Sequence, residues 1–243
     1  MPATIARELA PTGSESPLDC RVGAERRVAF ARADLGAMKR VEKAFGERTT
    51  VNDVALAMVA GALRGWLERR AIDCRRLRVK VPVSMHRAGE HDALGNRDSF
   101  MFVDLPVAEP DPVQRLLEVN AETAARKRLG DARTVYDFFN ELSHLAPPLY
   151  RAASRLAMSP RVFSLSVSNV PGPRQPVSVM GRGVAELYTL AEIAPRHALR
   201  VSIVSLAGSV GFGLCADARA LPDLPELASD VEHSLEELLA AAP

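Results

Sequence analysis

Two polar side chains end a segment of alternating apolar residues and serines, and two prolines follow within the next four residues. In the stretch FSLSVSNVPGP, apolar residues alternate with serines and then give way to Ser168 and Asn169. The alternation predicts a strand with one apolar face, and Pro171 and Pro173 end it because each fixes φ and lacks an amide donor. Gly172 between them is free to adopt a positive φ. A hydroxyl and a carboxamide at such a rigid corner could bind a polar group of a ligand, or the corner could simply end a strand.

A second polar pair, Asn52 and Asp53, opens a long apolar segment. Thr50 precedes Asp53 by three residues, a spacing that resembles a capping box with Asp in place of Glu or Gln. The helix that begins here is expected to run to about Arg70. It is apolar nearly all round from 54 to 63, which is typical of a helix buried on most sides. Asn52 and Asp53 either only stabilise the N-terminus of this helix or also contribute to a binding site.

The histidines show no pattern of a catalytic base, a role that a His of near-neutral pKa normally fills. None is adjacent to another and none is followed four residues later by Asp; they are His86, His91, His144, His197 and His233. The sequence has no GxSxG elbow, no Walker loop and no metal-ligand spacing. Gly211, Gly213 and Ala216 match GxGxxA, but inside a strand pattern, which is the wrong context for a dinucleotide site. We therefore expect neither a catalytic residue nor a metal site in this chain.

The elements that must position these residues follow from periodicity and from Gly and Pro punctuation. Residues 1–25 are rich in Pro, Ser, Thr and Gly and predict a linker or arm, which leaves 26–243 as one domain. We expect helices near 34–45, 51–70, 112–129, 133–145, 147–157 and 224–239. We expect strands near 26–32, 77–85, 97–107, 163–168, 176–180, 184–194, 199–206 and 210–215. The fold class is therefore α/β, with a mixed sheet covered by helices.

Two details of the strands are specific enough to test. Pro82 lies within the strand at 77–85, so that strand is expected at a sheet edge or beside a bulge. Gly208 and Ser209 are expected to form a two-residue hairpin turn between the last two strands.

Composition excludes several classes of function. The chain has 243 residues, of which 47% are hydrophobic and 25% charged, as in an ordinary globular protein. A net charge of +1 and an aromatic content of 5% argue against nucleic-acid binding. Cys20, Cys74 and Cys215 are odd in number and far apart, which predicts reduced thiols and a cytoplasmic location. No signal peptide opens the sequence, and no apolar run reaches the roughly 18 residues that a membrane span needs.

Charge is nevertheless uneven along the chain. Seven basic residues fall between Arg64 and Lys80, whereas the segment from Asp223 to Glu237 is rich in acids. The basic run is either a solvated surface or a patch for an anionic cofactor or lipid head groups.

Five motifs together resemble a known family. They are TVNDV at 50–54, LGNR at 94–97, FVDLPV at 102–107, SNVPGP at 168–173, and VGFGLCAD followed by ALPDL at 210–224. In this order they resemble the C-terminal half of the bacterial wax ester synthase/diacylglycerol acyltransferase family, and the resemblance covers about residues 26–242.

The resemblance implies a chloramphenicol-acetyltransferase-like fold of two similar α/β halves, with a tunnel between them where acyl-CoA meets an alcohol or diacylglycerol. Acyl-CoA would be a cosubstrate, and no permanently bound cofactor is expected. Asn52, Asp53, Ser168, Asn169 and the 171–173 corner are the candidates for lining the tunnel. The catalytic HHxxxDG motif of the family lies in the N-terminal half and is absent from this sequence.

Two functions remain open at this point. The chain is either the C-terminal half of an acyl-CoA-dependent O-acyltransferase, making triacylglycerol or wax esters with an N-terminal half supplied in trans, or a non-catalytic remnant that binds acyl groups or CoA. In both, an exposed half-tunnel would favour self-association or a peripheral location at a membrane or lipid droplet.

Overall fold

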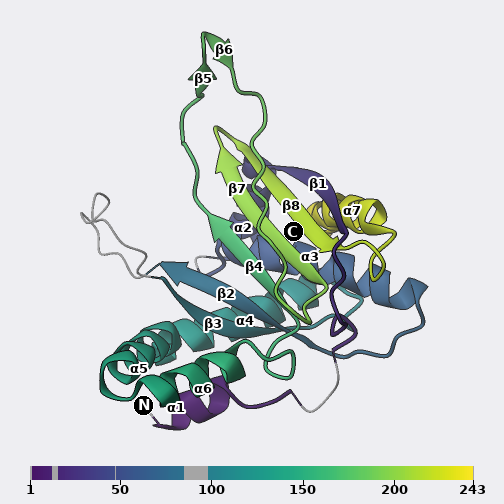
Figure 1. Cartoon of the computed structure of the whole chain (residues 1–243). Coiled ribbons are helices and arrows are strands. Elements are labelled where there is room, and N and C mark those ends of the chain that lie inside the picture. Colours follow the sequence, from purple (N-terminus) through teal and green to yellow (C-terminus); the bar gives the residue numbers. More distant parts are fainter. Residues whose placement is uncertain (1, 13–15, 47, 85–97, 243) are drawn as a thin grey trace.

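Figure 1 shows the computed structural model, which describes residues 2–12, 16–46, 48–84 and 98–242. His86, His91 and the LGNR motif at 94–97 lie outside these ranges. The described residues form a mixed sheet of six strands in the order β1-β8-β7-β4-β2-β3. These strands are β1 (Arg26–Asp34), β2 (Leu77–Ser84), β3 (Asp98–Leu105), β4 (Leu165–Val170), β7 (Leu199–Leu206) and β8 (Ser209–Asp217). The predicted α/β fold with a mixed sheet is confirmed.

Seven helices accompany the sheet in the described ranges: α1 (Pro2–Glu8), α2 (Leu35–Ala44), α3 (Val51–Arg69), α4 (Pro112–Leu129), α5 (Asp131–Leu145), α6 (Pro147–Ala157) and α7 (Leu224–Ala241). Figure 1 shows α3, α4 and α7 behind the sheet. We call the opposite face of the sheet, which is in front in this view, the open face. Most buried side chains lie between the sheet and these helices in one core cluster.

Helix α3 is the central element of this layer, and its predicted capping box is confirmed. The Thr50 hydroxyl accepts from the Asp53 amide, and the Asp53 carboxylate accepts from the Thr50 amide. Gly61 in α3 faces α7 so closely that a Cβ there would lie 2.5 Å from the Ser234 Oγ. The small residue therefore permits close packing of the two helices.

Strands β2 and β4 run parallel but pair over two residues only, Val79 with Leu165 and Lys80 with Ser166. Beyond Lys80 the two strands diverge. Pro82 lies just past this point, in a strand that has β3 and β4 as neighbours. Of the two predicted contexts, a sheet edge or a bulge, the edge is therefore wrong for the strand as a whole, although Pro82 itself is paired on the β3 side only. Proline is tolerated here because β2 has no ladder partner on its β4 side at this position.

The segment 184–194 does not form the predicted strand. It follows a small hairpin, β5 (Ser178–Val179) and β6 (Arg182–Gly183), that projects from the body of the molecule (Figure 1). It then crosses β8, where Cβ atoms on Gly211 and Gly213 would lie 2.2 Å from the Leu187 carbonyl and 2.0 Å from the Thr189 carbonyl. The two glycines that match GxGxxA therefore allow the 184–194 backbone to lie directly against β8.

The hairpin turn between β7 and β8 differs by one residue from the expectation. Leu206 pairs with Ser209, so the two turn residues are Ala207 and Gly208 rather than Gly208 and Ser209. Both have positive φ, 44° and 99°, as a type I′ turn requires.

The first 25 residues, predicted as a linker or arm, include helix α1, which packs against α5. Glu8 at its end is 1% exposed and forms an ion pair with Arg126 of α4. Its other carboxylate oxygen accepts from the Phe102 amide of β3 at 3.1 Å. Burial raises the pKa of Glu8, and the Arg126 charge opposes that rise.

Most of the basic run at 64–80 is engaged in ion pairs, and two of these reach the acidic C-terminal segment. Arg70 binds Asp223 through both terminal nitrogens at 2.6 Å, and Arg69 binds Asp230 at 2.6 Å. Three further residues of the run also pair with acids: Arg64 with Glu68, Arg76 with Glu118, and Arg78 with Asp104. The run therefore largely neutralises neighbouring carboxylates of the same chain. Among the described residues, no helix is long and apolar enough to cross a bilayer.

Candidate functional site

The proline corner at the end of β4 is fixed against the end of β7. The Gly172 amide donates to the Ser205 hydroxyl at 3.1 Å, and the Ala207 amide donates to the Pro173 carbonyl at 3.0 Å. Gly172 does not have the positive φ that was considered for it. A Cβ at this residue would lie 1.9 Å from the Ser205 carbonyl oxygen, so the glycine is required by close backbone approach.

The structure brings together two of the predicted residues that are 117 positions apart. The Asn169 Nδ2 donates a hydrogen bond to the Asn52 Oδ1 at 3.2 Å. Asn169 reaches α3 because it shares a strand face with Leu165 and Val167, which are buried toward the helices. Both asparagines are half-buried, and they lie where β4 has continued past its pairing with β2. This Asn52–Asn169 bridge links the start of α3 to the end of β4.

Asp53 has a different environment from Asn52. It is fully buried, and besides Thr50 it accepts from the Thr123 hydroxyl at 2.7 Å and the Asn120 side-chain Nδ2 at 3.1 Å. All of these donors belong to the start of α3 or to α4. Asp53 therefore ties two helices together and makes its contacts away from the corner.

Ser168 lies on the opposite face of β4 from Asn169, because successive residues of a strand alternate. It pairs in register with Ser202 of β7 and is half-buried on the open face. Pro171 and Pro173 are exposed, so within the corner they shape the backbone rather than pack against a core. The corner thus presents Ser168 and Asn169 to two different sides of the sheet.

The described histidines make no arrangement for proton transfer with a neighbouring acid in a cavity. His144 is exposed on α5, and His233 is exposed on α7 beside Glu236. His197 is 2% exposed, its ring stacks on Phe163 at 4.2 Å, and its Nδ1 donates to the Pro195 carbonyl at 2.9 Å. Burial lowers the pKa of His197, which keeps it neutral at pH 7. In the described ranges no three His, Cys, Asp or Glu side chains gather into a potential metal site.

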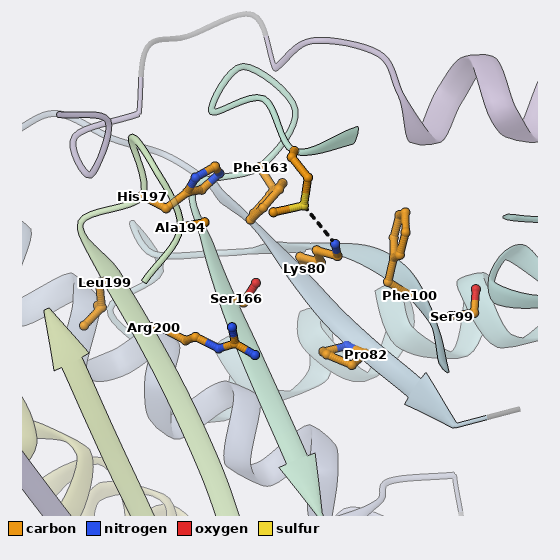
Figure 2. Close-up of a pocket in the computed structure, with 11 residues that line it drawn as sticks. Lys80, Pro82, Ser99, Phe100, Phe163, Ser166, Ala194, His197, Leu199 and Arg200 are labelled. Atoms are coloured by element: carbon orange, nitrogen blue, oxygen red, sulfur yellow. Dashed lines mark hydrogen bonds between the residues drawn. The ribbon is translucent and has the colours of Figure 1, made fainter. Parts of the chain in front are cut away.

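A cavity that the sequence analysis did not anticipate opens on the open face, between β2, β4 and β7. Its volume is about 280 Å³. Figure 2 shows Lys80, Ser166 and Arg200 along it, with Phe100, Phe163 and His197 around them. The alternation of apolar and polar residues in two predicted strands places Lys80 and Ser166 on the polar faces of those strands. The sequence does not show that the two strands are neighbours in the sheet, so it does not predict that these residues line one cavity.

The Asn52–Asn169 bridge can offer complementary hydrogen bonds to an amide or a carbonyl. Each carboxamide has two N–H donors and one acceptor oxygen, and the bridge uses one donor of Asn169 and the acceptor of Asn52. Asn52 therefore retains N–H donors, and Asn169 retains its oxygen. Such a pair can bind a carbonyl oxygen through Asn52 and an amide N–H through Asn169.

Comparison with solved structures first defines the class of fold. The chain superposes on the epimerization domain from the third module of tyrocidine synthetase B with a TM-score of 0.62 at 13% identity, covering 100% of this chain and 55% of that one. At this identity the likeness shows the fold alone, which is that of the chloramphenicol-acetyltransferase-like and condensation domains. It superposes more closely on a wax ester synthase/diacylglycerol acyltransferase from Marinobacter aquaeolei, with a TM-score of 0.75 at 27% identity over 99% of this chain and 54% of that one.

Sequence comparison then gives the family. Residues 94–239 match the family described as the WS/DGAT C-terminal domain. A protein named a probable diacylglycerol O-acyltransferase from Mycobacterium tuberculosis is 34% identical over 226 residues, which is 92% of this chain and 49% of the relative. The chain belongs to the wax ester synthase/diacylglycerol acyltransferase family and corresponds to its C-terminal domain. It spans about half the length of the curated relatives that it matches.

Proposed function

We propose that this chain is the C-terminal half of an acyl-CoA-dependent O-acyltransferase that makes triacylglycerol or wax esters and that depends on an N-terminal half carrying HHxxxDG. The observation that carries the proposal is the match to about half the length of relatives named diacylglycerol O-acyltransferases. The Asn52–Asn169 bridge supports it, since two residues from separate family-like motifs meet at one point.

In the proposed reaction the hydroxyl oxygen of an alcohol or diacylglycerol attacks the thioester carbonyl of acyl-CoA. A base removes the hydroxyl proton, an ester bond forms, the C–S bond breaks, and the CoA sulfur leaves with a proton. The base belongs to the half that carries HHxxxDG, because none of this chain's described histidines faces a cavity together with an acid. A positioned base contributes about 10²–10⁴-fold to such a step.

The role proposed for this chain is to bind and orient the thioester substrate. Asn52 has N–H donors for the thioester carbonyl or for a pantetheine carbonyl, and the Asn169 oxygen can accept from a pantetheine amide. Because the Gly172 contact and the two prolines fix the corner, these groups are held in place before the substrate binds. Ser168 faces the other side of the sheet and contributes to a separate wall of the proposed tunnel.

The test is reconstitution. The purified chain is assayed with acyl-CoA and a long-chain alcohol or diacylglycerol, alone and mixed with the N-terminal half of a relative that carries HHxxxDG. We expect no ester from the chain alone and measurable ester from the mixture. Turnover by the chain alone that is lost in the His144→Ala or His197→Ala variant would overturn the proposal. An inactive mixture whose C-terminal half still binds acyl-CoA would favour the non-catalytic remnant instead.

A further inference from the structure

Three side chains from three adjacent strands form a row across the open face of the sheet. Lys80 of β2 pairs in register with Ser166 of β4, and Ser166 pairs with Arg200 of β7. Residues in register on neighbouring strands project to the same face, and the strands lie about 4.8 Å apart. The row therefore places two cations on either side of one hydroxyl, and Figure 2 shows all three side chains along the same cavity.

Among the residues that the structure describes, no carboxylate pairs with either cation of this row, unlike most cations nearby. Two residues before Lys80, Arg78 binds Asp104 of β3 at 2.8 Å. The β3 residue opposite Lys80 is Phe102, which offers no charge. Arg200 donates to the Glu192 main-chain carbonyl, whereas the Glu192 carboxylate binds Arg26 at 2.5 Å. Among the described residues that line the cavity, none is an Asp or Glu.

The Lys80 ammonium lies in an apolar and aromatic environment. Its Nζ is 4.2 Å from the centre of the Phe100 ring and 3.3 Å from the Met158 Sδ. Burial, together with the nearby Arg200 charge, lowers the pKa of Lys80 to about 8. An anion bound between the two cations would relieve their repulsion and raise the pKa of Lys80 again.

A second cavity of about 420 Å³ adjoins the first and shares Lys80, Ser99, Phe100 and Met158 with it. Its other walls come from α5 and α6 and combine apolar or aromatic side chains, including Val135, Phe139 and Tyr150, with polar side chains of the same two helices. The two cavities thus provide a cationic end and an adjacent groove that has apolar and aromatic side chains in its walls. That division matches a molecule with a charged head group and a hydrocarbon chain.

We propose that these two cavities form a binding site for a single-chain anionic lipid. The carboxylate or phosphate head group lies over Ser166 between Lys80 and Arg200, and the hydrocarbon chain lies along the groove beside α5 and α6. This site is on the face of the sheet opposite the Asn52–Asn169 bridge. It does not rest on the proposed acyltransferase function and needs no partner half.

Charge complementarity selects this class of ligand over its alternatives. A long-chain alcohol fills the groove but leaves the two cations unpaired, and a long-chain ammonium repels them. Free inorganic phosphate pairs with the cations but buries no apolar surface in the groove. A carboxylate and a phosphate monoester share the required chemistry, so both head groups must be compared.

The test is calorimetric titration of the intact chain with four ten-carbon probes below their micelle concentrations. We expect decanoate or decyl phosphate to bind at a ratio of one to one, and the tighter of the two identifies the head group. Decanol and decyltrimethylammonium are expected to bind at least about tenfold more weakly. Equal binding of decanol and both anions would overturn the proposal, and so would binding of none of the probes. These comparisons use the wild-type chain and do not depend on the folding of a variant.

Variants then locate the site. Lys80→Met and Arg200→Met are each expected to weaken anion binding about tenfold or more, because each removes a charge-assisted contact. The matched control is Lys39→Met on α2, an exposed lysine remote from both cavities, which should bind as the wild type does. If Lys80→Met or Arg200→Met binds the anion as tightly as the wild type does, the anion binds elsewhere and the proposed site is overturned.

The pH dependence gives a further readout. The titratable groups that line the two cavities are Lys80, His197, Arg200, Tyr136 and Tyr150. Because the pKa of Lys80 in the free chain is about 8, wild-type affinity should fall as the pH rises above that value. Lys80→Arg keeps its charge over this range and should show a flat profile from pH 7 to about 9. The same fall in Lys80→Arg as in the wild type would contradict the assignment of Lys80.

Discussion

At the scale of single residues, the chain separates two asparagines that can contact a ligand from an aspartate that cannot. Asn52 and Asp53 are adjacent in sequence, yet Asn52 bonds with Asn169 whereas Asp53 is fully buried among Thr50, Asn120 and Thr123. Neighbouring positions on a helix differ by about 100° around its axis, so one faces the strand end and the other faces α4. Of these two adjacent residues, Asn52 is therefore a candidate binding residue and Asp53 is a structural residue.

The first prediction concerns the two asparagines and requires the reconstituted enzyme. Asn169→Ala should lower ester synthesis about tenfold or more with little change in melting temperature, because it removes a fixed polar contact from a half-buried site. Asn52→Ala should lower both activity and melting temperature, since it also alters the first turn of α3. Ser229→Ala, an exposed substitution on α7, is the control. If Asn169→Ala keeps full activity, the corner only ends a strand.

At the scale of elements, α3 and α4 are joined by the buried carboxylate of Asp53. Asp53→Ala takes the carboxylate acceptor from the Thr50 backbone amide, and it leaves the Asn120 side-chain amide and the Thr123 hydroxyl with only their bonds to main-chain carbonyls. We expect a loss of about 2 kcal/mol or more in the free energy of unfolding, because hydrogen bonds to a buried charged group are lost and the link between α3 and α4 is broken. Chemical denaturation measures this loss. The matched control is Asp73→Ala, which is exposed and should change stability by no more than about 0.5 kcal/mol.

A second prediction at this scale tests why residue 172 is glycine. Gly172→Ala places a methyl group 1.9 Å from the Ser205 carbonyl oxygen, so the corner must move away from β7. We expect a loss of about 1–3 kcal/mol, comparable to an overpacked core position. Gly183→Ala in β6 is the control, because a Cβ there meets nothing within 4 Å. Equal stability of the two variants would show that the close approach at Gly172 is not required.

The sequence predicts elements better than it predicts the contacts between them. Local patterns were sufficient for the capping box of α3 and for the strand that leads to Asn169, because both depend on residues a few positions apart. The segment 184–194 was misassigned because an apolar segment can cross a sheet as well as join it. Its crossing depends on Gly211 and Gly213, which lie further along the chain. The row of Lys80, Ser166 and Arg200 depends on strand order, which no local pattern contains.

At the scale of the whole molecule, apolar side chains remain exposed on the helices beside the anionic-lipid site. Leu145 at the end of α5 is 83% exposed, and Leu149 and Leu156 of α6 are 58% and 44% exposed. Tyr150 and Met158 link this surface to the groove that they line. Exposed apolar residues gathered near a lipid-binding groove are typical of a surface that contacts another protein or a membrane. This surface is therefore the candidate for the expected self-association or lipid recruitment.

The last prediction tests that surface on the chain alone. We expect the wild-type chain to cosediment with vesicles of phosphatidylcholine and phosphatidylglycerol, or to self-associate in sedimentation velocity, because the exposed leucines gain by leaving water. The double variant Leu145→Ser/Leu149→Ser should reduce whichever of the two is observed by about fivefold or more, since each leucine contributes roughly 1 kcal/mol or more on burial. The matched control is Leu117→Ser/Leu129→Ser on α4, two leucines that are 40% and 58% exposed. A monomeric wild-type chain that ignores the vesicles would contradict the expectation. Equal losses in the two double variants would mean that general hydrophobicity, rather than the surface of α5 and α6, drives the association.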